Sequence, residues 1–432
     1  LSMSDWHAIV VGAGAAGLLA AARAAERGRR TLLLEKNPRP GIKILMSGGT
    51  RCNLTHATDS RGIVHEFGPP GRFLHSALAA LSPPQLVDLF EREGVATKIE
   101  PDTGKIFPLS DRAADVLGAL LARLHRSGCT LALDEALVDV QLMPEGGFLA
   151  VTSKRQLTAE KLLITSGGQS YPGSGTTGDG YRWAAALGHT IVPPRPALTP
   201  ITTDAVWVRT LKGVTIPDVS LRVMETEPAA EPEAVQTKPP RTKRGKPGPL
   251  AERRGSFLFT HFGLSGPVAL DVSRVVSGHA RPRSLLLVCD FLPETSEAAL
   301  DERIRQDAAA AGKKQLGGLF ASLLPRRLTD ALLANVGLSL DRRAAELGRD
   351  ARARCVAAIK TCQIPISGTL GFKKAEVTAG GVSLAEVDSR TMESRLVPGL
   401  YFAGEVLDLD GPIGGYNFQA AFSTGWLAAE SL

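Results

Sequence analysis

The sequence predicts an α/β fold in which a two-part domain, built from both ends of the chain, is interrupted by an inserted domain. Three observations predict it. The chain starts with a β-α-β pattern, its middle has a residue pattern typical first of strands and then of helices, and strand-like and glycine-rich segments return near the end. The 432 residues suit two or three domains, and 44% hydrophobic with 22% charged residues describes a globular chain, which excludes a disordered chain and a membrane bundle.

The positions where the residue pattern changes predict the domain boundaries. Residues 1–193 and 365–432 form the two parts of the first domain. Residues 194–364 form the insertion, which is β-rich over 194–292 and helical over 293–364. No fixed-period repeat is present, so a solenoid is excluded.

The opening pattern predicts a dinucleotide site. An apolar strand, Ile9–Val11, runs directly into Gly12-Ala13-Gly14-Ala15-Ala16-Gly17, and a helix is expected to follow as far as Gly28. The first glycine allows the tight turn, the second lets the backbone approach a pyrophosphate, and the third lets the helix pack on the strand. Glu35 ends the next strand, Thr31–Leu34, about where a carboxylate for a ribose hydroxyl is expected.

A second glycine pattern, residues 173–178, fits the same formula without the same context. It follows Ser170-Tyr171-Pro172 instead of a strand, and no acidic residue ends a later strand at the right distance. We therefore expect one dinucleotide half-site and no separate NAD(P)H domain.

A glycine-dense loop, residues 41–53, follows the strand that ends at Glu35. Its backbone N–H groups can wrap a phosphate or the edge of an aromatic ring. Cys52 in this loop is more simply a small buried residue than a redox partner for a flavin, because no second cysteine lies near it in sequence.

The C-terminal segment supplies further elements of a cofactor site. A strand ends at Gly404-Glu405, whose carboxylate can fix a polyol hydroxyl, and Gly414-Gly415 opens a last helix whose N-terminus can hold negative charge. Asp408 and Asp410 lack neighbouring His or Cys ligands, so we predict no metal site.

The positive charge is concentrated in one segment. The net charge is +6, and Thr226–Arg254 holds seven basic and four acidic residues in a Pro-rich stretch without hydrophobic periodicity. This segment is predicted to be a flexible charged loop between strands, and it carries half of the net charge. The charge left for the rest of the chain argues against a nucleic-acid partner.

The cysteine content and the longest apolar run indicate where in the cell the protein is expected. Five cysteines without a C-x-x-C pattern fit a reducing, cytoplasmic location. The longest apolar run, residues 8–22, has fifteen residues, short of the about 18 that suggest a spanning helix. We expect no membrane partner.

Together these motifs resemble the two-part FAD-binding domain of the NAD(P)/FAD-dependent oxidoreductase family that includes aminoacetone oxidases and BaiN-like bile-acid dehydro-steroid reductases. Further matches extend over nearly the whole chain: Gly104–Asp111, Thr177–Gly180, Gly263–Pro267, Gly380-Gly381 and Thr391–Ser394. The resemblance implies a Rossmann-like FAD-binding domain interrupted by a small β-barrel plus a helical bundle.

The resemblance also implies the residues that bind FAD. The glycines of the first turn meet the pyrophosphate, Glu35 the adenosine ribose, Glu405 the ribitol, and the start of the last helix the flavin ring. The full predicted set is Gly12, Gly14, Ala16, Gly17, Glu35, Lys36, Lys43, Ser47, Gly48, Gly49, Arg51, Asn53, Ser166, Gly167, Gly404, Glu405, Asn417, Phe418 and Gln419.

This sequence departs from the family pattern in two places. Thr50 stands where a third glycine is usual, and Thr165-Ser166-Gly167-Gly168 stands where the family has Ala-Thr-Gly-Gly. Both changes are small and should leave FAD binding intact.

The chemistry expected is hydride transfer at the flavin to or from a small molecule. Either an NAD(P)H-dependent reductase, with the nicotinamide docking transiently, or an oxygen-using amine oxidase fits. Arg51, Tyr171, His261 and Tyr416 are polar loop residues that can face the ring, but no catalytic residue is assigned. The alternatives are an RNA-associated flavoprotein that uses the basic loop, and a flavin-binding protein without turnover.

Overall fold

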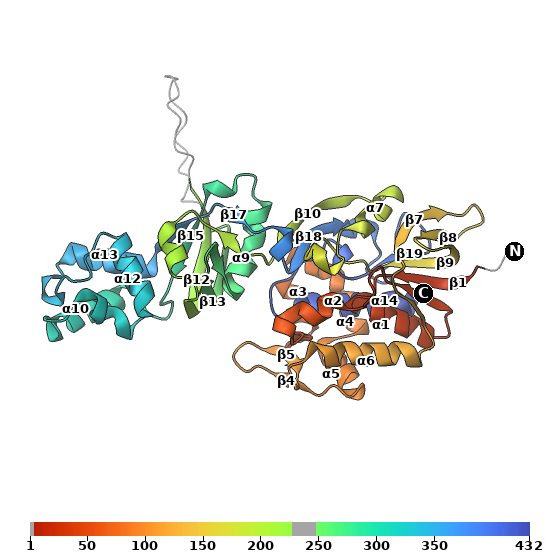
Figure 1. Cartoon of the computed structure of the whole chain (residues 1–432), viewed down its shortest axis with the longest axis horizontal. Coiled ribbons are helices and arrows are strands. Elements are labelled where there is room, and N and C mark those ends of the chain that lie inside the picture. The colour runs from red at the N-terminus through yellow and green to blue at the C-terminus, as the bar shows by residue number, and fades with distance from the viewer. Residues whose placement is uncertain (1–3, 227–247) are drawn as a thin grey trace, which may run out of the picture. The chain divides into compact units, whose positions relative to one another are not determined.

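The structure, a computed structural model, describes residues 4–226 and 248–432, which divide into two compact units (Figure 1). Unit 1 holds the residues up to Pro196 together with Ala375–Leu432, and unit 2 is Ala197–Lys374. The predicted insertion, 194–364, thus starts and stops a little earlier than the compact unit. The predicted α/β class with a Rossmann-like sheet is confirmed.

Unit 1 is built on a seven-stranded sheet with the order β6-β2-β1-β9-β8-β7, in which β19 also pairs with β9. Strands β6, β2, β1, β9 and β19 are parallel, whereas β8 and β7 are antiparallel additions. The bounds are β1 Trp6–Val11, β2 Thr31–Leu34, β6 Thr130–Ala132, β7 Leu137–Leu142, β8 Phe148–Thr152, β9 Gln156–Ile164 and β19 Leu400–Phe402.

Four of the parallel strands end at one level of the sheet. Val11 is in register with Leu34 and with Ile164, and Ile164 is in register with Phe402. The chain therefore leaves β1, β2, β9 and β19 side by side. Ligands of open α/β sheets bind at this carboxyl edge, so the register decides where a cofactor site can lie.

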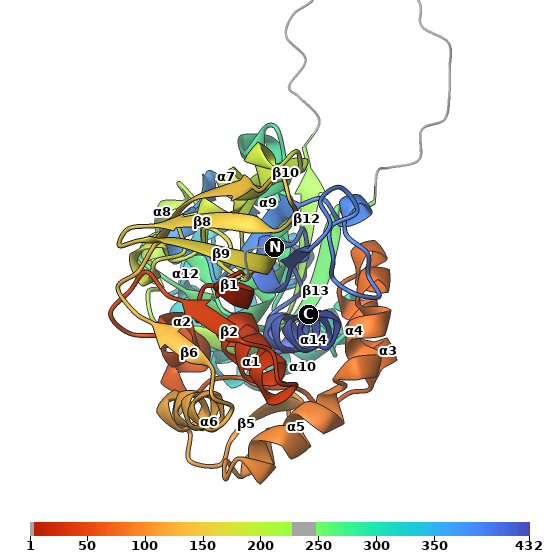
Figure 2. The same ribbon diagram turned by 90° about the vertical axis from the view of Figure 1, so that its right-hand side faces the viewer.

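Both faces of the middle of this sheet are buried, which is why β2 and β19 are apolar runs and why β1 and β9 end in one. The core under α1 (Ala15–Glu26) and α14 (Tyr416–Ser431) contains Ala8, Val10, Leu33 and Leu163. The strand neighbours of these residues point into a second core on the opposite face. Figure 2 shows α14 end-on, with α1 and α4 beside it. The core is thus divided by the sheet into two layers.

Helices and short sheets complete unit 1. Its helices are α1 Ala15–Glu26, α2 Ile42–Met46, α3 Ser60–Glu66, α4 His75–Ala80, α5 Pro83–Arg92, α6 Ala113–Arg126, α7 Asp179–Ala186 and α14 Tyr416–Ser431. The short 3₁₀ turns are η1 Ser47–Thr50, η2 Pro69–Leu74, η3 Pro172–Ser174, η8 Leu384–Glu386 and η9 Gly404–Val406. One small sheet has the order β3-β5-β4, and a second pairs β10 with β18. Their bounds are β3 Thr55–His56, β4 Thr97–Ile99, β5 Lys105–Pro108, β10 Ile191–Ala197 and β18 Val377–Val382.

Strands β10 and β18 carry the chain into and out of unit 2. Ser383 N donates to Thr190 O at 3.0 Å, and Gly380 lies against the carbonyl of Pro193. These contacts show that the two strands run in opposite directions. The insertion therefore leaves and rejoins unit 1 at one place.

Unit 2 holds an antiparallel seven-stranded sheet with the order β16-β15-β12-β13-β14-β11-β17. The bounds are β11 Ile201–Thr202, β12 Thr215–Glu225, β13 Ala251–Phe259, β14 Gly263–Ser265, β15 Leu285–Asp290, β16 Cys362–Pro365 and β17 Gly368–Thr369. Its helices are α8 Val206–Thr210, α9 Pro267–Gly278, α10 Glu297–Ala310, α11 Leu316–Leu319, α12 Arg326–Asn335 and α13 Arg349–Lys360. The 3₁₀ turns are η4 Pro282–Ser284, η5 Phe320–Ser322, η6 Ala344–Glu346 and η7 Phe372–Lys374.

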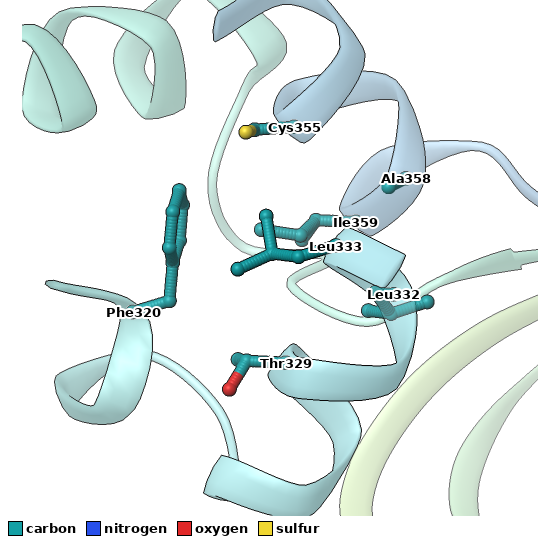
Figure 3. Close-up of a pocket in the computed structure, with 7 residues that line it drawn as sticks. All are labelled: Phe320, Thr329, Leu332, Leu333, Cys355, Ala358 and Ile359. Carbon is teal, nitrogen blue, oxygen red and sulfur yellow. The ribbon is translucent and has the colours of Figure 1, made fainter. Parts of the chain in front are cut away.

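The strand-rich and helical parts of unit 2 share one apolar core. It continues from Phe257 and Phe259 in the sheet through Phe291 to Leu300 and Phe320 in the helical part. Within the helices it leaves a cavity of about 10 Å³, lined by Phe320, Thr329, Leu332, Leu333, Cys355, Ala358 and Ile359 (Figure 3). That space holds about one water molecule and its lining is mostly apolar, so it is a packing defect and not a ligand site.

The charged segment is shorter than the sequence suggested. Residues 227–247 lie outside the described part of the chain, but Ala251–Phe259 is strand β13, so the predicted loop end at Arg254 is wrong. Arg254 lies opposite Ser220 of β12 and forms ion pairs with Asp218, at 2.7 Å, and with Glu294. Pairing with β12, which the charge pattern does not reveal, fixes this end of the segment as a strand.

Among the residues described, no helix has the length and apolar character needed to cross a membrane.

Candidate cofactor site

The turn between β1 and α1 is packed so closely that only glycine fits at two of its positions. Gly12 has φ +104°, and a Cβ at Gly17 would lie 1.9 Å from Gly12 O. A Cβ at Gly14, in contrast, would meet nothing within 4 Å. The first and last glycines are thus required by packing, and the middle one faces the open space that a pyrophosphate needs.

Glu35 lies beside this turn and holds its backbone. The carboxylate of Glu35 accepts hydrogen bonds from Ala13 N and Asn37 N, each at 2.9 Å, and from Asn37 Nδ2 at 2.7 Å. Because each carboxylate oxygen has two lone pairs, Glu35 keeps acceptor capacity for a ribose hydroxyl. The residue is 8% exposed, so it is close to the surface on which the nucleotide would lie.

The segment after β9 is tied to the same turn. Thr165 Oγ1 donates to Val11 O and Gly12 O, both at 2.9 Å. Ser166 Oγ is buried without a hydrogen-bond partner among the described residues, and Gly167 follows it with φ +73°. The threonine that replaces the usual alanine therefore adds a link between β9 and β1, and the serine leaves a free hydroxyl at the carboxyl edge of the sheet.

The glycine-dense loop adopts left-handed backbone over consecutive residues. Gly48, Gly49 and Thr50 have φ values of +54°, +67° and +71°, and Cys52 has +61°. Such a conformation is strained for Thr50 and Cys52. Ser47 Oγ donates to Ile44 O at 2.8 Å, and a Cβ at Gly49 would meet nothing within 4 Å. The loop thus presents its backbone to open space.

Glu405 gathers four distant segments of the chain at one point. Its carboxylate accepts hydrogen bonds from Ser170 Oγ at 2.7 Å and from Thr378 N at 2.9 Å. Lys43 forms an ion pair with Glu405 and donates to Ser170 Oγ at 2.6 Å. Gly404, with φ +77°, lies over Ala16 of α1. The predicted Lys43 and Glu405 are therefore joined directly.

The N-terminus of α14 is held by hydrogen bonds of Asn53 and Gln419. In the amide orientation that satisfies both ends, Asn53 accepts from Gly415 N at 2.9 Å and donates to Thr55 O at 2.9 Å. Gln419 is fully buried; it accepts from Thr55 Oγ1 at 2.6 Å and donates to Leu81 O at 3.0 Å. These two side chains thus position the start of the helix, and their contact with a cofactor stays a prediction.

Two other predicted residues at α14 also act within the protein. Asn417 Nδ2 donates to Gly411 O at 2.9 Å, and its Oδ1 accepts from Gly411 N at 2.8 Å. Phe418 packs near Phe422, with ring centroids 6.0 Å apart. Asn417 thereby fixes the loop that precedes the helix, and Phe418 anchors the helix to the core.

Lys36 and Arg51 are occupied by acidic neighbours. Lys36 Nζ forms a 2.6 Å ion pair with Asp179 at the start of α7. Arg51 pairs with Glu100 at 2.7 Å, and its guanidinium lies 3.9 Å from the centroid of the Phe107 ring. Arg51 therefore has an acid and an aromatic ring as neighbours, and its role at the cofactor stays a prediction.

The other polar candidates are divided between the units. Tyr171, with φ +52°, and Tyr416 lie in unit 1, where Tyr416 stacks on His56 with centroids 4.8 Å apart. Burial raises the pKa of Tyr171. His261 is exposed and belongs to unit 2.

Cys52 is not suited to redox chemistry. It is fully buried, and burial raises the pKa of its thiol to about 12. The thiol stays protonated at neutral pH and is therefore a poor nucleophile. Within the described residues, no group of three or more His, Cys, Asp or Glu side chains could hold a metal ion.

Sequence reasoning left out two residues of the site, Ser170 and Thr378. Both lie in motifs that are visible in the sequence, Ser170-Tyr171-Pro172 and Val377–Val382. Their meeting at Glu405 depends on tertiary structure, since the three residues come from widely separated parts of the chain. Motif position alone gave no reason to pair them.

These observations fit FAD. This region offers unfilled space at Gly14 and Gly49, a Ser166 hydroxyl without a partner among the described residues, and the carboxylate of Glu35. A dinucleotide needs this combination of close backbone approach, hydrogen-bonding groups and a ribose acceptor.

Comparison with known proteins adds relatives of defined activity. Residues 6–431 match the family described as HI0933-like protein Rossmann domain. The chain is 34% identical over 433 residues to a ribosomal RNA dihydrouridine synthase of Escherichia coli, which covers all of this chain and 98% of the relative. It is 31% identical to the Haemophilus influenzae protein of the same name, and 30% identical to a 3-dehydro-bile acid delta(4,6)-reductase of Clostridium scindens, with 98% of each chain covered in both cases.

These relatives overturn the argument against a nucleic-acid partner. That expectation is wrong, because two full-length relatives are named for a reaction on ribosomal RNA. The modest net charge was wrongly used as an argument against RNA binding. RNA binding depends on where the basic side chains lie on the surface, and the net charge of the chain does not show their positions.

Proposed function

Because this chain belongs to the HI0933-like protein Rossmann domain family and is a FAD-dependent oxidoreductase, we propose that it reduces uridine in ribosomal RNA to dihydrouridine. The observation that carries the proposal is the full-length identity to the Escherichia coli ribosomal RNA dihydrouridine synthase. The electron donor we propose is NADH or NADPH, which binds only transiently.

The chemistry favours a reductase over an amine oxidase. A uridine C5=C6 bond is conjugated to the C4 carbonyl, and the relative from Clostridium scindens is named for reducing a double bond system in a 3-dehydro steroid. Each reaction adds a hydride to one carbon of a double bond that is conjugated with a carbonyl group, and a proton to another carbon of the same conjugated system. One family can therefore accept unlike substrates while it keeps the reaction.

FAD, when bound, supplies the hydride that the nicotinamide has delivered. The residues of this chain that would hold it include Gly14, whose open turn would meet the pyrophosphate, and Glu35, which would accept from the adenosine ribose. Lys43 and Glu405 neutralise one another beside the expected ribitol. Asn53 and Asn417 fix the helix and the loop that would meet the flavin ring.

The test is to supply purified holoenzyme with protein-free ribosomal RNA and NADH or NADPH. The expected result is a uridine that gains the mass of two hydrogen atoms, detected by mass spectrometry of RNA fragments, and only when a nicotinamide donor is present. RNA that stays unmodified with both donors, while the flavin is reduced by them, would contradict the proposal.

A second candidate is reduction of a small conjugated ketone, which the Clostridium scindens relative supports. A 3-oxo-steroid with a conjugated double bond, added in place of RNA, distinguishes the two. Turnover of the steroid without modification of RNA would favour this candidate.

A further inference from the structure

Two short loops of the helical part of unit 2 are joined side by side by backbone hydrogen bonds. Gln315 forms an antiparallel bridge with Arg343, and Ala344 N donates to Lys314 O at 2.8 Å. Leu316 N donates to the carbonyl of Arg342 at 2.9 Å. The joined backbones bring two pairs of consecutive basic residues, Lys313-Lys314 and Arg342-Arg343, to one place.

The loops are anchored by apolar side chains. Leu316 is fully buried and Ala344 is 1% exposed, whereas Lys313, Lys314 and Arg343 are all exposed. The cations are therefore carried on a fixed backbone instead of a mobile tail. A fixed arrangement of charges loses less conformational entropy when it meets a ligand.

Three of the four cations have no acidic partner in the part of the chain that the structure describes. Within the described residues, Lys313, Lys314 and Arg343 form no side-chain hydrogen bond or ion pair. Arg342 lies 3.9 Å from the carboxylate of Glu346. Five other basic side chains of the helical part are paired with acids: Arg303 with Asp307, Arg305 with Glu302, Arg326 with Asp330, Arg352 with Asp301 and Lys360 with Asp290. Arg327 and Arg354 donate to backbone carbonyls instead.

This contrast points to a polyanionic ligand. Like charges held close together repel one another unless an anion neutralises them. Lysine and arginine side chains on neighbouring loops suit the phosphates of a nucleic-acid backbone. A phosphate contact of this kind positions RNA without reading its sequence.

We propose that the basic patch formed by Lys313, Lys314, Arg342 and Arg343 binds the phosphate backbone of the RNA substrate. The proposal rests on the proposed function for the identity of the ligand. It assigns to the helical part of the insertion a role in RNA capture, separate from the chemistry at the cofactor site in unit 1.

The test compares two triple variants of the FAD-loaded enzyme. The patch variant is Lys313→Gln, Lys314→Gln and Arg343→Gln. The matched control is Arg303→Gln, Arg305→Gln and Arg326→Gln, which removes the same charge from exposed side chains of the same helical part. Binding to protein-free ribosomal RNA is measured by fluorescence anisotropy over a series of salt concentrations.

The patch variant is expected to bind RNA at least about tenfold more weakly, with the slope of log K against log salt reduced by about one for each lost contact. The control is expected to bind like the wild type. Flavin reduction by the nicotinamide donor should be the same in all three proteins, because this step needs no RNA.

Equal RNA binding by the wild type and the patch variant would overturn the inference. Equal weakening of RNA binding in the patch variant and the control variant would overturn it too, because the effect would then depend only on the net charge of the protein. If the wild type modifies RNA and the patch variant does so equally well, the inference fails while the proposed function stands. If the patch variant alone loses binding but the wild type forms no dihydrouridine, the inference stands while the proposed function fails.

Discussion

Glu35 shows how one residue serves both the fold and the expected cofactor. Its position at the end of β2 was readable from the strand-and-glycine pattern, and the structure adds that its carboxylate holds Ala13 N and Asn37 N. The pattern cannot reveal these bonds, because they form only when the β1–α1 turn and the chain after β2 meet at the sheet edge.

Changing Glu35→Gln should weaken FAD binding. The amide puts a donor where backbone N–H groups need an acceptor, and loss of a charged hydrogen bond costs about 1.5–3 kcal/mol, or about 10- to 100-fold in affinity. Titration of apoprotein with FAD, followed by flavin fluorescence, measures the change. Glu145→Gln, at an exposed site between β7 and β8, is the control and should bind FAD normally.

His189 links stability to pH. Its side chain is fully buried, with Nε2 2.8 Å from Ser394 Oγ and Nδ1 3.3 Å from Glu386. Burial lowers the pKa of His189 below its usual 6.5, and the nearby Glu386 only partly offsets this. The folded state thus favours the neutral imidazole, so the unfolded chain binds more protons once the pH falls below about 6.5.

The free energy of unfolding should therefore be unaffected by His189 above that pH and should decrease as the pH falls below it. Urea unfolding at several pH values between neutral and about 5 measures the effect. In His189→Gln the same stretch of the pH profile should be flatter; an identical slope in both proteins would show that other groups cause it.

At the scale of elements, the opening order β1-α1-β2 was predictable because both strands are short apolar runs and a glycine turn separates the first strand from the helix. The first residues of strand β13, Ala251–Arg254, were not, since three of these four residues are charged and look like a continuation of the preceding segment. Pairing with β12 and the ion pairs of Arg254 decide its structure, and neither is a local property.

Lys360 shows how an element boundary is stabilised. At the end of α13 this side chain is 6% exposed, pairs with Asp290 of β15 at 2.6 Å and donates to Leu292 O at 2.7 Å. It thereby ties the last helix of the insertion to the end of a central strand.

Replacing Lys360→Met should lower the free energy of unfolding by about 2–4 kcal/mol, because it leaves a carboxylate and carbonyls without their donor. Denaturant unfolding measures this loss. The exposed Arg303→Met, which breaks only an i,i+4 pair with Asp307, should cost less than about 0.5 kcal/mol. Adding Asp290→Asn to the first variant should recover part of the loss.

At the scale of the whole molecule, the predicted cofactor residues all fall in unit 1, and the proposed RNA patch falls in unit 2. Each unit has its own core. In unit 1 the core has two layers, one on each side of the sheet, and in unit 2 it is a single continuous cluster. The sequence predicted this division from texture, but not the continuity of the core between the strand-rich and helical parts of the insertion.

The division predicts how FAD affects thermal unfolding. A ligand present at 100 times its dissociation constant adds about 2.7 kcal/mol to the stability of the folding unit that binds it. Calorimetry should therefore resolve two transitions, of which FAD raises only one. A single transition, or equal shifts of both, would contradict independent unfolding of the units.

The antiparallel pairing of β10 with β18 has a consequence for how such a chain can be assembled. Strands β10 and β18 of unit 1 form a hairpin whose loop is the whole of Ala197–Lys374, because Pro193 and Gly380 lie opposite one another. A turn of about two to five residues is enough to join two such strands. Exchange or removal of the insertion would therefore leave the seven-stranded sheet of unit 1 uncut. The RNA contacts proposed for unit 2 and the cofactor site proposed for unit 1 could then change independently of one another.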